Sequence, residues 1–147
     1  MAKKTIKIKN YSDVNEEIVA AGTITPGMLL ELTSAGTVQA HSVASGNALP
    51  MFACEDELVG KTITDNYSEL DQVSVWVPGR GDVVYGILAQ GENVTIGTYL
   101  VSKGNGHLKA VADSSSFGDD DSAKIIGQAI EAVNATAAAA NIMVRII

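Results

Sequence analysis

The sequence has a single cysteine, Cys54, and no long hydrophobic run. One cysteine allows no intrachain disulfide, and it excludes a zinc site built on a cysteine cluster. No stretch reaches the roughly 18 apolar residues that a membrane span needs, and the N-terminus alternates Lys with Ile where a signal peptide has an apolar run. We therefore expect a protein that folds in a cytoplasm and has no membrane partner.

Aromatic residues and histidines are also scarce. The seven aromatics are far outnumbered by Val, Ile, Ala and Leu, which favours sheets packed through β-branched side chains over an aromatic-lined ligand cavity. His41 and His107 have no patterned Cys or Asp beside them, so neither a metal site nor a catalytic triad is predicted. Both are predicted to be surface residues of strands. Trp76 is interpreted as a core or interface residue, with a ligand platform as the alternative.

Lys and Arg are few, and they are unevenly distributed along the chain. The net charge is −7, yet Lys3, Lys4, Lys7 and Lys9 give the first nine residues a charge of +4, and the remaining six Lys and Arg stand against 17 Asp and Glu. Such an acidic body argues against nucleic acid as a partner, because phosphate binding needs a basic face. The basic start is either an ordinary soluble tail or an arm that docks on an acidic surface of another protein.

The residues that are present predict a single all-β domain of the small barrel or sandwich-like kind, because short β-rich runs recur and each is closed by Gly, Pro, Asn, Asp or Ser. We divide the chain into a basic N-terminal arm, residues 1–10, and one β domain, residues 11–147. Residues 83–89 are expected to lie antiparallel to residues 72–77. A loop is predicted at about 113–122. The predicted strands are 5–9, 28–33, 38–42, 49–55, 72–77, 83–89, 99–102, 107–111, 124–133 and 141–147.

An Ala-rich stretch is the hardest to assign. Residues 122–140 have good helix propensity, but Gly127 lies in the middle of the most apolar part. We favour a strand at 124–133 followed by an Ala-rich loop, and a helix remains the alternative.

An internal repeat supports the β interpretation. Residues 24–40 and 94–110 match at a fixed offset of 70 positions: Thr lies two before the first glycine, Leu three after it, and a second glycine nine after it. An apolar residue and an alanine then follow at equal spacings. The pattern predicts a duplicated β-hairpin whose two copies pack together.

No constellation for chemistry is found, so no catalytic, cofactor-binding or metal-binding residue is predicted. Cys54 is interpreted as a small buried hydrophobe with no nearby base. The acidic runs 55–57 and 119–121 lack the spacing of a calcium loop and are interpreted as solvated charge. The Arg80-Gly81-Asp82 tripeptide is interpreted as a plain turn. An enzyme is therefore not expected.

Several stretches together resemble the capsid decoration proteins of tailed bacteriophages, also called cement or head-stabilising proteins. The resemblance runs over most of the chain, and its motifs are hydrophobic and glycine patterns without an active site. The stretches are 26–32 with 38–41 (PGMLLEL and VQAH), 48–53 (ALPMFA), Gly60-Lys61, 75–82 (VWVPGRGD) and 141–146 (NIMVRI).

The resemblance implies a structural virion protein, made in the cytoplasm of a bacterial host, that binds the outer surface of the capsid as a homotrimer and stabilises the head. Its partner would be the major capsid protein, and a preformed trimer would add several modest contacts into a tight attachment. The N-terminal arm could add a strand to a capsid sheet. The alternatives are another virion component, such as a head fibre base or a small tail protein, and a carbohydrate- or cell-surface-binding β module. The predicted capsid contacts are Lys3, Lys4, Ile6, Lys7, Ile8 and Lys9.

Overall fold

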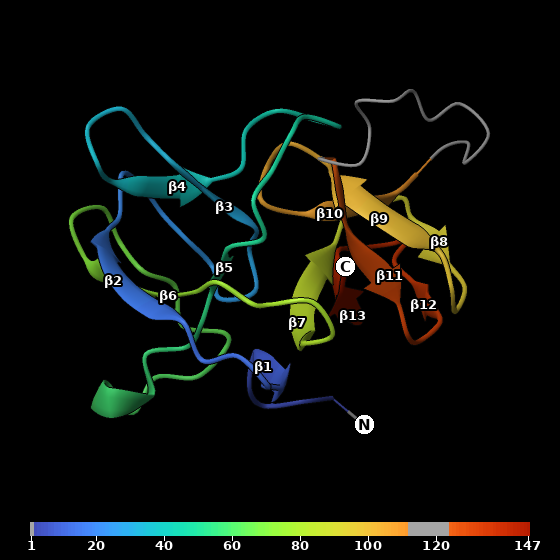
Figure 1. Ribbon diagram of the computed structural model, residues 1–147, viewed down its shortest axis with the longest axis horizontal. Helices are drawn as coiled ribbons and strands as arrows, with labels where there is room; N and C mark the ends of the chain where they lie inside the picture. The colour runs from blue at the N-terminus through green and yellow to red at the C-terminus, as the bar shows by residue number, and fades with distance from the viewer. Residues whose placement is uncertain (1, 112–123) are drawn as a thin grey trace.

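The computed structural model describes residues 2–111 and 124–147, and it shows two lobes side by side (Figure 1). We call residues 11–77 the sheet lobe, and the described residues of 2–10 and 78–147 the barrel lobe. The predicted loop at 113–122 lies outside the described residues. The elements in chain order are β1 (Lys7–Lys9), β2 (Asn15–Val19), β3 (Leu30–Leu32), β4 (Val38–Ala40), β5 (Phe52–Ala53), the 3-10 turn η1 (Glu57–Val59), β6 (Gln72–Trp76), β7 (Val83–Leu88), β8 (Asn93–Val94), β9 (Tyr99–Ser102), β10 (Leu108–Ala110), β11 (Ile125–Ala129), β12 (Val133–Asn134) and β13 (Ala140–Ile146).

The barrel lobe is a closed five-stranded barrel with one extra strand. Its strands follow the order β7-β10-β9-β11-β13, and β13 returns to pair antiparallel with β7 from Ala140↔Leu88 to Arg145↔Val83. On its other side, β7 pairs with the extra strand β1 near its start and with β10 near its end. Closure leaves β7 with neighbours along both edges, and all six of its residues are buried. That burial explains why its sequence, VVYGIL, does not alternate.

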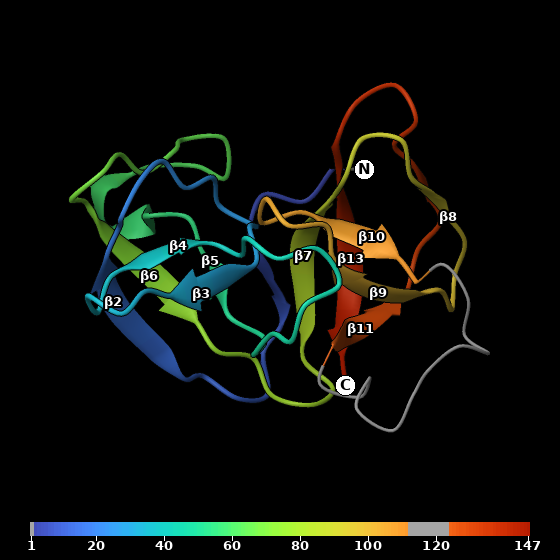
Figure 2. The same cartoon turned by 90° about the horizontal axis from the view of Figure 1, so that it is seen from above.

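The sheet lobe is built from smaller sheets. One has the order β2-β6-β5, and the other is the β3–β4 hairpin. Between them lies a separate apolar core of nine buried residues, among them Ile24, Leu30 and Val75. Figure 2 shows the same separation from above, with β2, β6, β3 and β4 on one side and the barrel strands on the other.

The two lobes are joined by side chains that alternate between the two cores. Because successive strand residues point to opposite faces, Phe52 and Trp76 join the barrel core while Ala53 and Val75 join the core of the sheet lobe. Both large aromatics are completely buried. The core interpretation of Trp76 is therefore correct.

The predicted repeat corresponds to two antiparallel hairpins, β3–β4 and β9–β10. Its glycines adopt matching left-handed conformations, with φ of 96° at Gly27 and 94° at Gly97, and of 82° at Gly36 and 78° at Gly106. A side chain at these positions would be strained, which explains why the repeat is marked by glycine. The hairpins also touch, because Gly106 donates a hydrogen bond to the His41 carbonyl and accepts one from the Leu29 N–H.

The structure confirms the all-β prediction and corrects three details. The strands β6 and β7 are not a hairpin: they belong to different sheets, because the turn after Pro78 carries the chain from one lobe to the other. The strand β2 was not predicted, since its sequence NEEIV is mostly exposed and acidic. Residues 5–9 do not form a separate arm, because β1 is part of the barrel sheet.

Over its described part, the Ala-rich stretch contains the favoured strand and loop, but the predicted strand at 124–133 is divided into β11 and β12. Residues 125–129 form β11, and residues 135–139 lie between β12 and β13 without a helix. Within the described residues, no helix is long and apolar enough to cross a membrane.

Candidate functional site

The six predicted contact residues of the N-terminal segment have different environments. Lys3, Lys4 and Lys9 are exposed. Ile6 is completely buried in the barrel core, so its side chain offers no contact surface, and this part of the prediction is wrong. Lys7 and Ile8 are half-buried, and Ile8 packs against the same core. The signal for Ile6 was the Lys/Ile alternation itself, which indicates a strand with one face against a core.

Lys7 is held against the sheet lobe rather than presented to solvent. Its Nζ donates to Oδ1 of Asp13 at 2.8 Å and to Oδ1 of Asn15, and it lies 5.5 Å from the centre of the Trp76 ring. The hydrogen bond from Lys7, followed by those from Asn15 and Asn10, lowers the pKa of the Asp13 carboxyl to about 2. Lys7 therefore anchors β1 to the chain that leads into β2.

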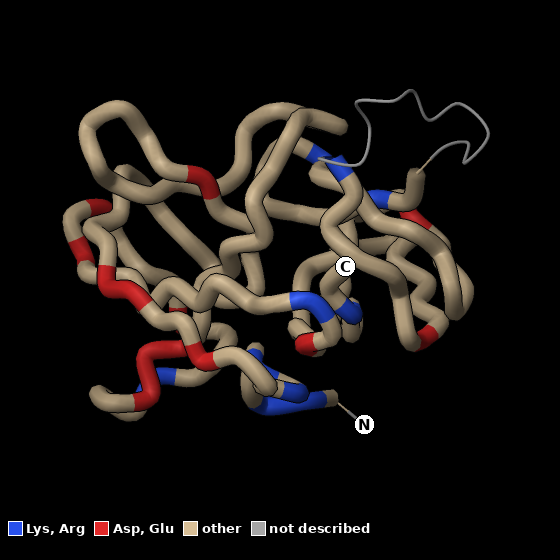
Figure 3. The backbone as a smooth tube through the Cα atoms, in the orientation of Figure 1, with Lys and Arg blue, Asp and Glu red and all other residues tan. Residues whose placement is uncertain are grey.

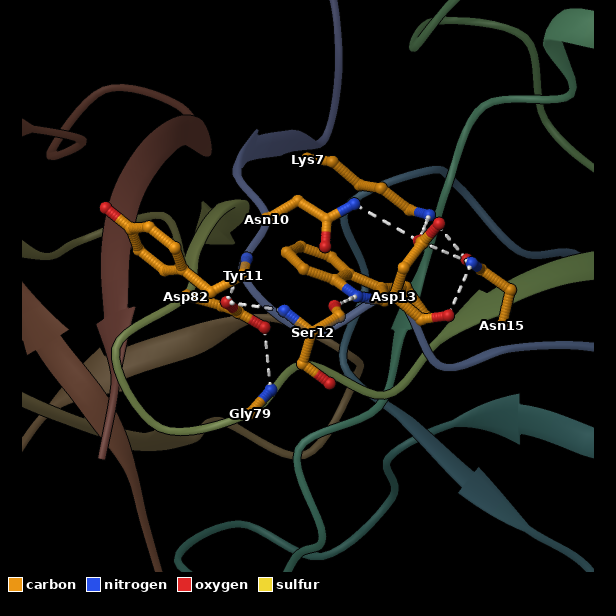
Figure 4. A network of polar contacts seen from close by, with 9 residues as sticks. Lys7, Asn10, Tyr11, Ser12, Asp13, Asn15, Gly79 and Asp82 are labelled. Atoms are coloured by element: carbon orange, nitrogen blue, oxygen red, sulfur yellow. Dashed lines mark hydrogen bonds and ion pairs between the residues drawn. The ribbon is translucent and has the colours of Figure 1, made fainter.

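Asp82 forms the joint between the two lobes (Figure 4). Its completely buried carboxylate accepts hydrogen bonds from the backbone N–H groups of Tyr11 at 2.7 Å, Ser12 at 3.3 Å and Gly79 at 2.8 Å. The Trp76 indole N–H donates to the Ser12 carbonyl at 3.0 Å beside it. The two chain segments that connect the lobes, near residues 10–12 and 77–79, are thus both bound to one carboxylate. The Asp82 side chain of the Arg80-Gly81-Asp82 turn points inward.

A cleft of about 390 Å³ opens beside Lys7, between the N-terminal segment and the 3-10 turn. The Cys54 side chain borders it, and burial raises the pKa of that thiol to about 12, so the sulfur stays protonated. Cys54 is 5% exposed, as expected for a small buried hydrophobe. The carboxylates along the cleft are those of Asp13, Glu17, Glu55, Asp56 and Glu57.

The η1 turn at the rim of this cleft carries apolar side chains into solvent. Leu58 is 89% exposed and Val59 is 65% exposed, and no residue of η1 is buried. Sequence reasoning treated this region only as an acidic run. The sequence signal for this exposed pair is that Leu58 and Val59 directly follow three acidic residues and do not fit the apolar periodicity of a strand or a helix.

The prediction that His41 lies on the surface is wrong. Its ring is only 2% exposed, with Nε2 3.0 Å from the Asn47 carbonyl and Nδ1 2.7 Å from Oγ of Ser102. A carbonyl only accepts, so Nε2 carries the proton and the Ser102 hydroxyl donates to Nδ1. Ser102 is completely buried and accepts from the Gly104 N–H, which makes this pair a link between the two hairpins and leaves no exposed nucleophile there.

The surroundings of His41 and His107 differ in charge. The Glu31 carboxylate lies 3.7 Å from Nε2 of His41, and although burial opposes it, hydrogen bonds from Ser42 and Gln39 lower the Glu31 pKa. His107 is half-buried, and burial lowers its pKa. The part of the chain that the structure describes contains no cluster of three or more His, Cys, Asp or Glu able to hold a metal ion, and residues 119–121 lie outside it.

The two lobes carry opposite charge (Figure 3). The sheet lobe has ten carboxylates and a single cation, Lys61, for a net charge of −9. The described residues of the barrel lobe have nine Lys and Arg against three acids, Asp82, Glu92 and Glu131, for a net charge of +6. The four remaining acids of the chain fall within 112–123. The described parts of the two lobes therefore differ in the sign of their net charge, and such a difference favours oriented encounters with charged surfaces.

Comparison with known proteins gives no assignment. No family model matches the chain, and a search of curated proteins returns no match.

Proposed function

We propose that this protein is a structural virion protein that binds the outer surface of a tailed-phage capsid as a homotrimer and stabilises the head. It bridges subunits of the major capsid protein, and it is neither an enzyme nor a nucleic-acid- or membrane-binding protein. The proposal starts from the resemblance in the stretches around residues 26–41, 75–82 and 141–146. It is supported by the all-β fold and by exposed charged surfaces, which suit binding to another protein.

The observation that carries the proposal is the exposed lysine-bearing segment Ala2–Thr5, which leads directly into β1. Within the described residues, β1 is the outermost strand of its sheet and pairs with β7 alone. An outermost strand can receive a strand from a partner, and Lys3 and Lys4 beside it favour an acidic partner surface. The contact segment is thus shorter than the predicted arm, because Ile6 belongs to the barrel core.

Cosedimentation with undecorated capsids tests the proposal. The wild-type protein is expected to pellet with the capsids, and Lys3→Glu/Lys4→Glu is expected to weaken the attachment at least tenfold, because two charges reverse in several copies at once. Lys61→Glu/Lys103→Glu is the matched control, since it makes the same charge change at exposed sites elsewhere. Deleting residues 1–10 would be a poor test, since it also removes Ile6 from the core.

The same assay separates the alternatives. Binding to isolated tails instead of capsids would indicate a different virion component, and binding to glycans would indicate a carbohydrate-binding module. Among the described residues, the exposed aromatics are Tyr11 and Tyr99, at 78% and 40%, which is a small surface for stacking on sugars. No binding of wild-type protein to any head preparation would overturn the proposal.

A further inference from the structure

The sheet lobe carries an exposed turn with the composition of a docking element. In residues 56–59, Asp56 and Glu57 precede Leu58 and Val59, whose side chains are 89% and 65% exposed. The turn is held by its backbone, since the Asp56 carbonyl accepts from the N–H groups of Val59 and Lys61, and the Asp56 side chain makes no capping bond. Leu58 and Val59 therefore contribute nothing to the core of their own chain. Exposed apolar side chains that are grouped in this way are typical of contact surfaces.

A patch of the opposite charge, also with exposed apolar side chains, lies where the barrel lobe meets Tyr11, the first residue of the sheet lobe. Lys9 and Arg145 both pair with Val83, one from each neighbouring strand of β7. The turn with Arg80 lies against the chain end, because Gly81 donates to the Ile146 carbonyl and Ile146 donates to the Asp82 carbonyl. Tyr11, which is bound to Asp82 through its N–H, is 78% exposed, and Ile147 is 48% exposed. Figure 4 shows the Tyr11 ring pointing away from Ser12.

The one acid beside this patch, Asp82, already has hydrogen-bond partners within its own chain. The Asp82 carboxylate is completely buried and accepts three backbone hydrogen bonds, so it is not exposed to an incoming partner. Lys9, Arg80 and Arg145 are all exposed, and within the described residues none of their side chains makes a hydrogen bond or an ion pair. The patch therefore presents three cations around two apolar side chains.

We propose that residues 56–59 of one copy dock on the patch formed by Lys9, Tyr11, Arg80, Arg145 and Ile147 of a second copy. The carboxylates of Asp56 and Glu57 face the cations, and Leu58 and Val59 pack against the exposed apolar groups of Tyr11 and Ile147. The inference rests on the oligomer in the proposed function and adds the contact that builds it. Its occupant is a second copy because each surface supplies both the charge and the apolar groups that the other lacks.

This contact is head-to-tail. The turn belongs to the sheet lobe, and the patch consists of barrel-lobe residues together with the adjoining Tyr11. Each copy therefore has one turn and one patch to offer to two different neighbours. Such a heterologous contact forms a ring when the rotation closes, whereas a two-fold dimer would make the same turn-to-patch contact twice, residue i to j and j to i. Two like-charged turns or two like-charged patches facing each other would repel. Because the contact is partly electrostatic, its strength is expected to fall as salt rises from 0.05 to about 0.5 M, where the Debye length shrinks to several ångströms.

Three variants test the contact by light scattering behind a sizing column. Asp56→Arg/Glu57→Arg reverses the turn, Arg80→Glu/Arg145→Glu reverses the patch, and the third variant combines all four changes. Wild-type protein is expected to be an oligomer of the 15.3 kDa chain. Each double variant is expected to be monomeric, and the combined variant is expected to regain the wild-type mass, because attraction is restored with the signs exchanged.

Matched controls keep the outcome decisive. Glu16→Arg/Glu69→Arg makes the same charge change at exposed sites of the sheet lobe outside the turn, and it is expected to leave the oligomer intact. Circular dichroism and thermal melting establish that every variant is folded. A monomeric wild-type protein, double variants that remain oligomeric, or a folded combined variant that stays monomeric would each overturn the proposal. Capsid cosedimentation of the same variants is a separate readout, so a wrong contact and a wrong function give different results.

Discussion

The two lobes solve the problem of unpaired sheet edges in different ways. The barrel lobe closes five of its strands on themselves, which leaves the short extra strand β1 as the outermost strand of that sheet, and its core is made by residues of almost every strand. The sheet lobe leaves β2 as an outermost strand and protects it with Glu16 and Glu17. It also carries eight of the eleven large hydrophobic side chains that are exposed among the described residues. The sheet lobe therefore exposes more apolar surface than the barrel lobe does.

Substitution of Asp82, which joins the two lobes, is expected to lower the free energy of unfolding most. Asp82→Ala removes the acceptor of three backbone N–H groups at a fully buried site, and we expect a loss of about 3–5 kcal/mol in the free energy of unfolding. Asp65→Ala is the matched control, because Asp65 also accepts a backbone N–H, from Thr62, but on an exposed turn. Urea denaturation measures both. Equal losses at the two positions would mean that the lobes are not joined through Asp82.

Packing in the barrel should tolerate less change than packing in the sheet lobe. A Cβ at Gly127 would lie 2.4 Å from the Arg145 carbonyl oxygen and 2.6 Å from Cγ1 of Val144, contacts that require β11 and β13 to separate. We expect Gly127→Ala to cost about 2–3 kcal/mol. The control is Gly22→Ala in the sheet lobe, where nothing lies within 4 Å of the new carbon. Thermal melting of both variants checks this, and a neutral Gly127→Ala would show that the barrel adapts more easily than its geometry indicates.

The link between the two hairpins should have an intermediate effect. Ser102→Ala leaves Nδ1 of His41 and the Gly104 N–H without their hydroxyl partner, and we expect a loss of about 1–2 kcal/mol. Ser34→Ala, at an exposed position of the first hairpin, is expected to be neutral. Denaturation curves compare the two variants. Hydrogen exchange should also quicken at Gly106, whose N–H joins the hairpins through the His41 carbonyl.

Sequence patterns predicted most of the barrel and less of the sheet lobe, for physical reasons. Runs such as VVYGIL and IMVRI are β-branched and closed by turn residues, and the glycines of the repeat require positive φ wherever the fold places them. The partners of a strand are a tertiary property, so the pairing of β7 with β13 instead of β6 had no local signal. The acidic strand β2 is stabilised by its pairing with β6 and lacks a β-rich composition of its own.

Side-chain environments were harder to predict than strands. Ile6 is predicted to contact a capsid and His41 to lie on the surface, yet Ile6 enters the barrel core and His41 is enclosed by Asn47 and Ser102. Burial of this histidine depends in part on Ser102, which is 61 residues away and lies outside any local window of sequence. Likewise, the exposed Leu58 looks like a core residue until the 3-10 turn places it in solvent.

The smallest expected effect concerns the ion pair that ties β1 to the sheet lobe. The pKa of Asp13 is lowered from 3.8 to about 2, first of all by the hydrogen bond from Lys7. A lowered folded-state pKa gives stability that is present above pH 4 and is lost as the pH falls toward 2. The carboxyl is fully exposed, so solvent screens the pair and the change in stability should be slight. NMR titration should place the Asp13 midpoint near 2 in the wild type and closer to 3.8 in Lys7→Gln. An unchanged midpoint in that variant would mean that Asn15 and Asn10 hold the carboxylate, and that Lys7 does not connect the two lobes.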